Sequence, residues 1–303
     1  MGPRGNFLFD GTHLLYRCAW QVAGRTKAKE PMWGRECVIG FLLSLRSVIF
    51  HYGPSSVCVV WDGGRSARRC HLFDGYKAQR PDRSPENHRA KQEDVVTLTG
   101  LLRLLGCRVI ALPGREGDDL IHLITLKLGG GTVVSDDHDF LQLVARGVSV
   151  YRPTTGKYIL PGFFAQEFGL PPEQYLLAKA LSGDSSDNVH GVPKVGYKTA
   201  VKILSQFPGV TTPEGLLAGL MTVVKPTKVQ LSVIDSLELL RRNLELFDST
   251  KEMFGDSEMK AVEHALRRGV TFDATILDEL IRLELQRVVE RFAEWSLPFR
   301  RLL

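Results

Sequence analysis

Acidic side chains directly follow four short apolar runs of this sequence, and their positions suggest chemistry. In chain order they are Asp10, Asp62, the group Glu116, Asp118 and Asp119, and the group Asp136, Asp137 and Asp139. A single acid after an apolar run usually makes a turn or caps a helix, but four successive examples are poorly explained in that way. Crowded carboxylates repel one another unless cations neutralise them, and hard oxygen ligands suit Mg²⁺ or Mn²⁺. Two such ions about 3.5–4 Å apart would suit phosphodiester hydrolysis.

The apolar runs before these acids are predicted to be strands of one sheet. They occupy residues 6–9, 57–61, 108–112, 132–135 and 148–151, and helix-like segments between them include residues 36–51, 94–105 and 119–128. This alternation is typical of an α/β protein with a central, mostly parallel sheet flanked by helices. Because parallel strands end at the same edge, we expect the acids to meet there, where open α/β sheets bind ligands.

The rest of the chain has a different pattern. Beyond about residue 161 the strand signals stop, and Pro and Gly turns separate helical segments. We therefore expect an α/β core at residues 1–160 and a helical region at residues 161–303.

A basic segment at residues 63–92 carries eight Lys or Arg side chains against three acids. Two prolines and little helical periodicity predict that most of it is exposed. Such a run is usually a solvated insertion. This one directly follows the strand that ends at Asp62, so it would overhang the site that Asp62 serves.

A glycine hairpin lies at residues 191–200, between helical patterns at residues 174–181 and 199–207. Glycines on both sides of a short apolar turn let backbone N–H groups approach a phosphate, and Lys194 and Lys198 add positive charge. A bare glycine turn between helices would be the ordinary explanation. Asp184 and Asp187, just upstream, favour a functional role.

Composition limits the remaining possibilities. The 303 residues have a formal net charge of +5, which only mildly favours a nucleic-acid partner. The five cysteines are scattered without zinc-type or disulfide-type spacing, which favours a reducing compartment. No apolar signal segment or run of transmembrane length is present, so we expect an intracellular protein without a membrane partner.

Together these blocks resemble the flap endonuclease / 5′→3′ exonuclease family, especially its phage and bacterial branch. The likeness covers residues 6–207, and beyond residue 209 only the helical character agrees. It implies a PIN-like nuclease core followed by a helix-hairpin-helix element at about residues 174–207. It also implies Mg²⁺ or Mn²⁺ at two or more positions, and K⁺ at the hairpin.

The resemblance assigns roles to individual residues. The implied ligands of the first metal group are Asp10, Asp62, Glu116 and Asp118, with Asp119 close by, and those nearer the second are Asp137, Asp139, Asp184 and Asp187. Since Asp136 is an extra acid, the choice between Asp136 and Asp137 stays open. Tyr76, Lys77 and Arg80 would lie at the base of a helical arch, where Lys77 and Arg80 steer the scissile phosphate and Tyr76 stacks on a terminal base. The implied duplex contacts are Gly191, Val192, Pro193, Lys194, Val195, Gly196, Lys198 and Thr199.

The expected function is a structure-selective 5′ nuclease that cuts 5′ flaps and 5′ ends of DNA in replication, repair or recombination. We expect the stand-alone form without a polymerase domain, a monomer in the cytoplasm of a bacterial cell or phage-infected host. The balance of flap and exonuclease cleavage stays open. The alternatives are a PIN-type ribonuclease and an inactive branched-DNA-binding protein. The hairpin and the basic segment argue against the first, and the nine carboxylates argue against the second.

Overall fold

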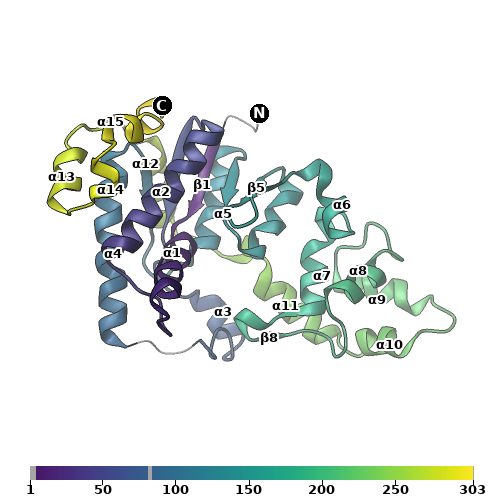
Figure 1. The fold of residues 1–303 in the computed structure, drawn as a ribbon. Helices are drawn as coiled ribbons and strands as arrows, with labels where there is room; N and C mark the ends of the chain where they lie inside the picture. The colour runs from purple at the N-terminus through teal and green to yellow at the C-terminus, as the bar shows by residue number, and fades with distance from the viewer. Residues whose placement is uncertain (1–4, 81–83, 303) are drawn as a thin grey trace.

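A six-stranded sheet forms the centre of the protein, whose computed structural model describes residues 5–80 and 84–302 (Figure 1). Its strands are β1 (Asn6–Asp10), β2 (Ser56–Val60), β3 (Arg108–Ile110), β4 (Thr132–Val134), β5 (Ser149–Arg152) and β6 (Lys157–Ile159). The spatial order is β3-β2-β1-β4-β5-β6, and only β6 runs antiparallel to its neighbour. The expected mostly parallel sheet is therefore confirmed. The order reverses between β1 and β4, which is the kind of position where open α/β sheets bind ligands.

The two faces of the sheet are covered by different helices. Phe7 and Phe9 of β1 belong to one apolar core, together with α1 (Gly11–Thr26), α2 (Arg35–Tyr52) and α4 (Pro85–Leu104). Leu8 points to the other face, where α5 (Gly117–Leu128) and much of the helical region pack. The alternation of side chains along the strand thus divides the core into two layers.

The basic segment contains more helix than its sequence pattern indicates. It forms α3 (Ala67–Leu72), a turn and the beginning of α4, while Arg83 lies outside the described residues. Helix α4 begins at Pro85 rather than at residue 94, because the Ser84 side chain accepts a hydrogen bond from the Asn87 N–H and Pro85 occupies the first turn.

The remaining elements are mostly short helices that follow the fourth strand. They are the 3₁₀ segments η1 (His138–Arg146), η2 (Pro161–Phe163), η3 (Pro172–Gln174), η4 (Ser185–Asp187), η5 (Ser249–Lys251) and η6 (Phe299–Arg301), and the helices α6 (Phe164–Phe168), α7 (Tyr175–Ser182), α8 (Tyr197–Leu204), α9 (Pro213–Met221), α10 (Lys228–Ile234), α11 (Leu237–Phe247), α12 (Asp256–Arg267), α13 (Ile276–Arg282), α14 (Gln286–Val289) and α15 (Phe292–Ser296). A small antiparallel pair, β7 (Gly183–Asp184) and β8 (Val189–His190), interrupts the helices. Two-residue strands leave no periodicity in a sequence, so this pair was not expected.

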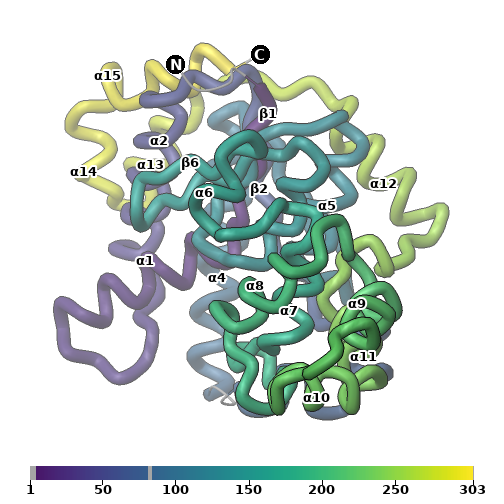
Figure 2. Tube along the Cα trace, turned by 90° about the vertical axis from the view of Figure 1, so that its right-hand side faces the viewer, coloured from purple at the N-terminus to yellow at the C-terminus, as the bar shows by residue number. Residues whose placement is uncertain are grey.

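The C-terminal segment returns to the first face of the sheet instead of continuing the helical region. Ile276, Leu280 and Trp295 are buried in the same core as Phe7. The Arg46 side chain of α2 donates to the Trp295 carbonyl oxygen at 2.9 Å. In two perpendicular views α13–α15 lie at the opposite end of the molecule from α8–α10 (Figures 1 and 2). Within the described residues, no helix is long and apolar enough to cross a membrane.

Candidate functional site

Asp10 and Asp137 lie on either side of the point where the strand order reverses. Asp10 ends β1, and Asp137 follows β4. The Ser135 hydroxyl joins them, since it donates to Asp10 Oδ2 at 3.1 Å and accepts from the Asp137 N–H at 3.1 Å. Burial raises the pKa of Asp10 well above its ordinary value, and the negative charge of Asp62 raises it further. Burial, reinforced by the charge of Asp139, raises the pKa of Asp137 to about 7.

Asp136 points away from this pair. Its Oδ1 accepts from the Thr154 N–H at 3.0 Å, and its Oδ2 accepts from the Thr154 hydroxyl at 2.7 Å. Arg17 lies 3.5 Å from the same Oδ2. The charge of Asp137 acts on Asp10 and raises its pKa further. Of the two neighbouring acids, the structure brings Asp137 to the sheet edge with Asp10.

Asp62, Glu116 and Asp118 meet beside the end of β2. Asp62 Oδ1 accepts from the Gly117 N–H at 2.6 Å. A Cβ atom at position 117 would lie 2.6 Å from that oxygen, so the glycine permits the close approach. Buried Glu116 accepts from the Ser66 N–H at 3.0 Å with one carboxylate oxygen. Its other oxygen accepts from the Tyr76 hydroxyl at 2.9 Å and from Lys77 Nζ at 2.5 Å.

Arg69 is a site residue that the sequence did not reveal, because nothing distinguished it within the basic run. Its guanidinium is buried and donates to both oxygens of Asp119, at 2.8 and 2.6 Å, and to Glu116 at 3.2 Å. Asp119 is 1% exposed, and both its oxygens are occupied by Arg69. Burial acts to raise the pKa of Asp118, but the charges of Arg69 and Lys77 outweigh it and lower the pKa.

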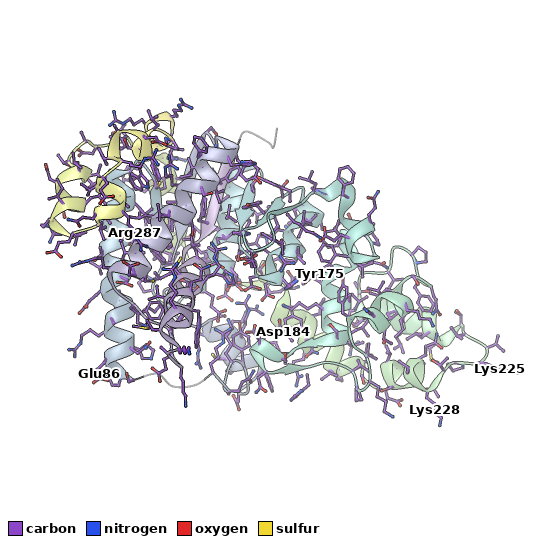
Figure 3. All side chains as sticks on the ribbon, in the orientation of Figure 1. Glu86, Tyr175, Asp184, Lys225, Lys228 and Arg287 are labelled. Carbon is purple, nitrogen blue, oxygen red and sulfur yellow. The ribbon has the colours of Figure 1, made fainter. Side chains whose placement is uncertain are left out.

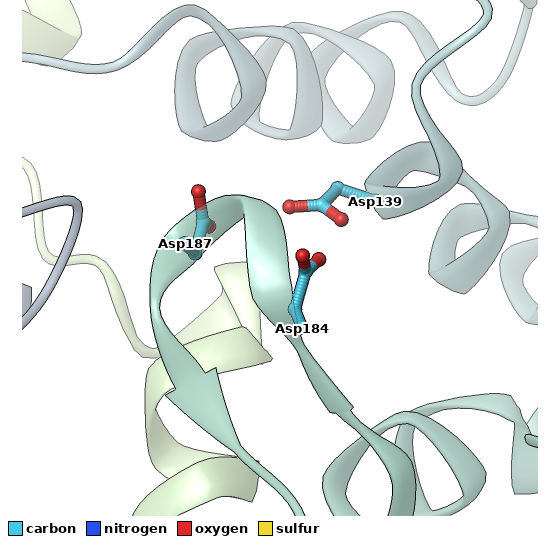
Figure 4. Close-up of side chains that lie close together, drawn as sticks. All are labelled: Asp139, Asp184 and Asp187. Carbon is cyan, nitrogen blue, oxygen red and sulfur yellow. The ribbon is translucent and has the colours of Figure 1, made fainter. Parts of the chain in front are cut away.

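A second carboxylate group combines two distant parts of the chain (Figure 4). Oxygen atoms of Asp139, Asp184 and Asp187 lie within 4.8 Å of one another. Asp139 comes from η1, whereas Asp184 ends β7 and Asp187 lies in η4, within the turn that joins β7 to β8. Burial raises the pKa of Asp187 to about 6. These spacings suit a shared cation.

Lys179 of α7 occupies a position beside this second group. Its buried ammonium contacts Asp139 and lies 2.9 Å from Asp184. Burial acts to raise the pKa of Asp184, but Lys179 outweighs it and lowers the pKa to about 2. Sequence reasoning missed Lys179, although a lysine within the apolar stretch of α7 was a usable signal. The Lys179 ammonium is thus a positive group that lies between the carboxylates of Asp139 and Asp184.

The basic segment folds directly onto both carboxylate groups. Lys77 Nζ lies 2.5 Å from Glu116 and 4.0 Å from Asp187, and Arg80 lies 3.0 Å from Asp187. The Lys77 N–H also donates to the Asp187 carbonyl oxygen at 2.9 Å. Tyr76 is 3% exposed and its ring lies against Lys77 Nζ at 4.8 Å. A nucleotide base therefore has no access to the Tyr76 ring in this arrangement.

The glycine hairpin is fixed by close backbone contacts. A Cβ atom at Gly191 would lie 2.3 Å from the Ser182 carbonyl carbon, so the chain after β8 approaches the end of α7 this closely only with glycine at this position. Val192 and Val195 are buried and anchor the hairpin in the core. The other predicted contacts are partly or fully exposed, namely Gly191, Pro193, Lys194, Gly196, Lys198 and Thr199. In Figure 3, Asp184 lies where the sheet meets the helical region, while Lys225 and Lys228 mark its far tip.

Two family models match consecutive parts of this chain. Residues 6–169 match the 5′-3′ exonuclease N-terminal resolvase-like domain, and residues 170–266 match the 5′-3′ exonuclease C-terminal SAM fold. The chain belongs to the 5′-3′ exonuclease family. The resemblance stated from the sequence is confirmed.

Individual relatives agree with this membership. The chain is 34% identical over 250 residues to the thermostable DNA polymerase I of Thermus thermophilus, a match that covers 80% of this chain but 28% of that protein. It is 30% identical over 208 residues to the 5′-3′ exonuclease of Aquifex aeolicus, covering 67% of this chain and 70% of that one. The chain thus spans about a quarter of the length of the polymerase relatives.

A solved structure has the same fold over nearly the whole chain. It is the bacteriophage T5 flap endonuclease in a pseudo-enzyme-product complex with DNA and metal ions. The TM-score is 0.62 at 22% identity, and the match covers 98% of this chain and 99% of that one. The likeness confirms the expected PIN-like fold.

Proposed function

We propose that this protein is a divalent-metal-dependent 5′ nuclease that hydrolyses DNA phosphodiesters, cutting 5′ flaps and removing nucleotides from 5′ ends in replication, repair or recombination. The observation that carries the proposal is the meeting of Asp139, from the sheet edge, with Asp184 and Asp187, from the turn beside the hairpin. This contact couples a candidate metal site to a candidate duplex-binding element. Family membership and the T5 flap endonuclease complex with DNA and metal ions support the same reading.

The donor atoms fit hard divalent cations, since every candidate ligand offers a carboxylate oxygen. We expect a first ion among Asp10, Asp62, Glu116 and Asp118, and a second among Asp139, Asp184 and Asp187. The resemblance places Asp137 nearer the second ion, but we now propose it for the first, because Ser135 holds it beside Asp10. Bound Mg²⁺ or Mn²⁺ supplies Lewis acidity and lowers the pKa of a bound water. Asp119 acts differently in this proposal: it positions the Arg69 guanidinium, which in turn holds Glu116.

Lys77 and Arg80 supply positive charge to the scissile phosphate. Each is held over the carboxylates by an ion pair, and Arg80 remains half exposed. Cations that neutralise Glu116 and Asp187 would release both side chains toward the phosphate oxygens, which they bind as charge-assisted donors. Tyr76 positions Glu116 through its hydroxyl, and stacking on a base would require its ring to leave the interior.

The hairpin binds the phosphate backbone of the duplex. No side chain caps the N-terminus of α8, and Lys194 and Lys198 lie beside it on the surface. Contacts of this kind carry no base information and suit binding that depends on DNA structure. We place K⁺, where it is bound, at this hairpin.

Cleavage of a 5′-flap duplex with Mg²⁺ and with EDTA tests the proposal. Asp137→Asn and Asp184→Asn should lower the cleavage rate by about a hundredfold or more, while binding of flap DNA in EDTA persists. Asp136→Asn is the matched control and should keep most of the activity, because Asp136 is held by Thr154. Full activity in Asp137→Asn, or faster cutting of single-stranded RNA than of flap DNA by the unaltered protein, would overturn the assignment.

A further inference from the structure

Glu252 is a buried carboxylate that none of the roles assigned above uses. It follows η5, its side chain is 2% exposed, and both of its oxygens accept hydrogen bonds. Ser66 Oγ donates to Glu252 Oε2 at 2.9 Å, and Arg68 Nε donates to the same oxygen at 3.1 Å. Arg115 Nη1 donates to Oε1 at 2.6 Å. One carboxylate from the helical region therefore joins the start of α3 to the loop after β3.

Ser66 connects Glu252 to the candidate metal ligand Glu116. The Ser66 N–H donates to Glu116 Oε1 at 3.0 Å, while the Ser66 hydroxyl accepts from the Arg69 N–H at 3.2 Å and so caps α3. Because the same hydroxyl donates to Glu252, the residue is held in place at three points. Arg69 in turn donates to the other Glu116 oxygen at 3.2 Å. Both oxygens of Glu116 thus depend on the beginning of α3, which Glu252 holds.

Arg115 connects Glu252 to the same ligand through the backbone. It directly precedes Glu116 in the chain, and its carbonyl oxygen accepts from the Gly63 N–H at 2.8 Å. Gly63 directly follows Asp62, so the Arg115 backbone joins the loops that carry two candidate ligands. Because Glu252 holds the Arg115 side chain, it acts on the position of Glu116 from a second direction.

Stability alone is a weak explanation for these buried ion pairs. Charged groups lose their hydration when they are buried, and apolar side chains of similar volume often stabilise an interior equally well. Hydrogen bonds to the groups around a metal ligand have another effect, since they fix the orientation of that ligand. Loss of such an outer contact typically weakens metal binding by about 10–100-fold.

We propose that Glu252 is a positioning residue for the first metal ion. It holds Glu116 through Ser66 and through Arg115, in the orientation that a cation requires, without contacting the ion itself. The inference rests on the proposed nuclease function and deepens it, because it makes the affinity for one ion depend on a residue outside both carboxylate groups. Within the described part of the chain, Glu252 bonds to none of the three acids of the second group.

Two variants interrupt this arrangement at different points. Glu252→Gln keeps the shape of the side chain but replaces one oxygen by an amide nitrogen, which cannot accept a hydrogen bond. Either the bond from Arg115 or the bonds from Ser66 and Arg68 must then be lost. Ser66→Ala removes the hydroxyl that joins Glu252 to α3 but keeps the N–H that donates to Glu116.

Each variant has a matched control. Glu258 of α12 accepts from the same Arg115 guanidinium, at 2.6 and 2.7 Å, but has no bond to Ser66 among the residues that the structure describes. Glu258→Gln therefore alters an ion pair of Arg115 without touching the start of α3. Ser84 caps α4 in the way that Ser66 caps α3, so Ser84→Ala reproduces the loss of a helix cap alone.

Calorimetric titration with Mg²⁺ in the absence of DNA is the first measurement. Glu252→Gln and Ser66→Ala should weaken one Mg²⁺-binding event about tenfold and leave the other within about twofold, and both controls should match the unaltered protein. The Mg²⁺ concentration that gives half-maximal flap cleavage should rise by the same factor, while kcat at saturating Mg²⁺ stays within about threefold. A loss of stability alone would reduce the amount of folded protein and leave the Mg²⁺ affinity of the folded fraction unchanged.

Unchanged Mg²⁺ affinity in Glu252→Gln, or an equal loss in Glu258→Gln, would overturn the inference and leave the nuclease assignment intact. A fall in kcat at saturating Mg²⁺ with unaltered affinity would also contradict it. If Glu252→Gln fails to fold, the comparison of Ser66→Ala with Ser84→Ala decides by the same criteria. Failure of the unaltered protein to bind Mg²⁺ or to cut flap DNA would instead overturn the proposed function itself.

Discussion

At the scale of single residues, the clustered carboxylates differ in what neutralises them. Asp184 has the Lys179 ammonium 2.9 Å away, which lowers its pKa to about 2 against the effect of burial. Asp137 forms no ion pair with the residues that the structure describes, and burial together with Asp139 raises its pKa to about 7. Lysines thus neutralise some of these groups, while others keep protons that a divalent cation would displace.

This difference predicts how metal binding depends on pH. A carboxyl with a raised pKa stays protonated below about pH 7, and only its ionised form binds a cation. Mg²⁺ affinity should therefore rise as pH increases, by up to about tenfold between about pH 5.5 and pH 6.5, and flatten above about pH 7.5. Calorimetry in buffers of different ionisation enthalpy would also count the protons released. Asp137→Asn should weaken binding and flatten the profile, and equal affinity across the range would contradict this prediction.

At the scale of elements, the pairing of β7 with β8 decides whether the two carboxylate groups meet. Gly183 has a φ of +73°, and a Cβ atom there would lie 2.2 Å from the Gly191 nitrogen. Asn243 of α11 joins α7 to β8 by donating to the carbonyl oxygens of Ala180 and His190. The positions of Asp184 and Asp187 therefore depend on a close backbone contact between Gly183 and Gly191, which leaves no room for a side chain at either position.

Gly191→Ala tests this dependence. The added methyl would lie 2.3 Å from the Ser182 backbone, so β8 must shift and carry the turn with Asp184 and Asp187 away from Asp139. We expect a fall in cleavage of about tenfold or more, with weaker Mg²⁺ binding, in a protein that still folds. Gly162→Ala is the control, because a Cβ atom there meets nothing within 4 Å. In Mg²⁺ titration and flap cleavage, Gly162→Ala should behave like the unaltered protein. If Gly191→Ala also behaves like the unaltered protein, the metal site does not depend on this backbone contact.

At the scale of the whole molecule, the C-terminal segment completes the core of the sheet. The second family model ends at residue 266, but Ile276, Leu280 and Trp295 beyond it are buried against α2 and α4. The Leu105–Phe272 bridge and the bond from Arg46 to the Trp295 carbonyl oxygen fasten this segment. The core around the sheet therefore includes residues from both ends of the chain.

Trp295→Ala should destabilise the protein without altering its chemistry. Truncating a buried aromatic side chain costs about 3–5 kcal/mol in the free energy of unfolding. Denaturant unfolding should show that loss, while kcat of the folded fraction on flap DNA at low temperature stays near that of the unaltered protein. Phe163→Ala is the control, since Phe163 is 60% exposed. A selective fall in kcat with no change in unfolding would contradict a purely structural role.

The sequence by itself determined the sheet, its parallel direction and the acids at its edge. These features are local: a short apolar run predicts a strand, and the residue that follows it must emerge where the strand ends. Asp10, Asp62, Glu116 and Asp137 could be proposed for this reason. The glycine hairpin and the acids before it were also visible as spacing along the chain.

Only the tertiary structure decided how these residues are used. Three side-chain contacts join residues that are distant in the sequence. Arg69 is buried against Asp119, the Lys179 ammonium contacts Asp139, and the Asp136 carboxylate accepts from Thr154. The return of α13–α15 to the sheet and the buried contacts of Glu252 likewise depend on which surfaces meet. Desolvation and packing decide which side chains pair in the interior. Both act between segments that are distant in the sequence, and no local sequence pattern shows that these segments lie close together in the fold.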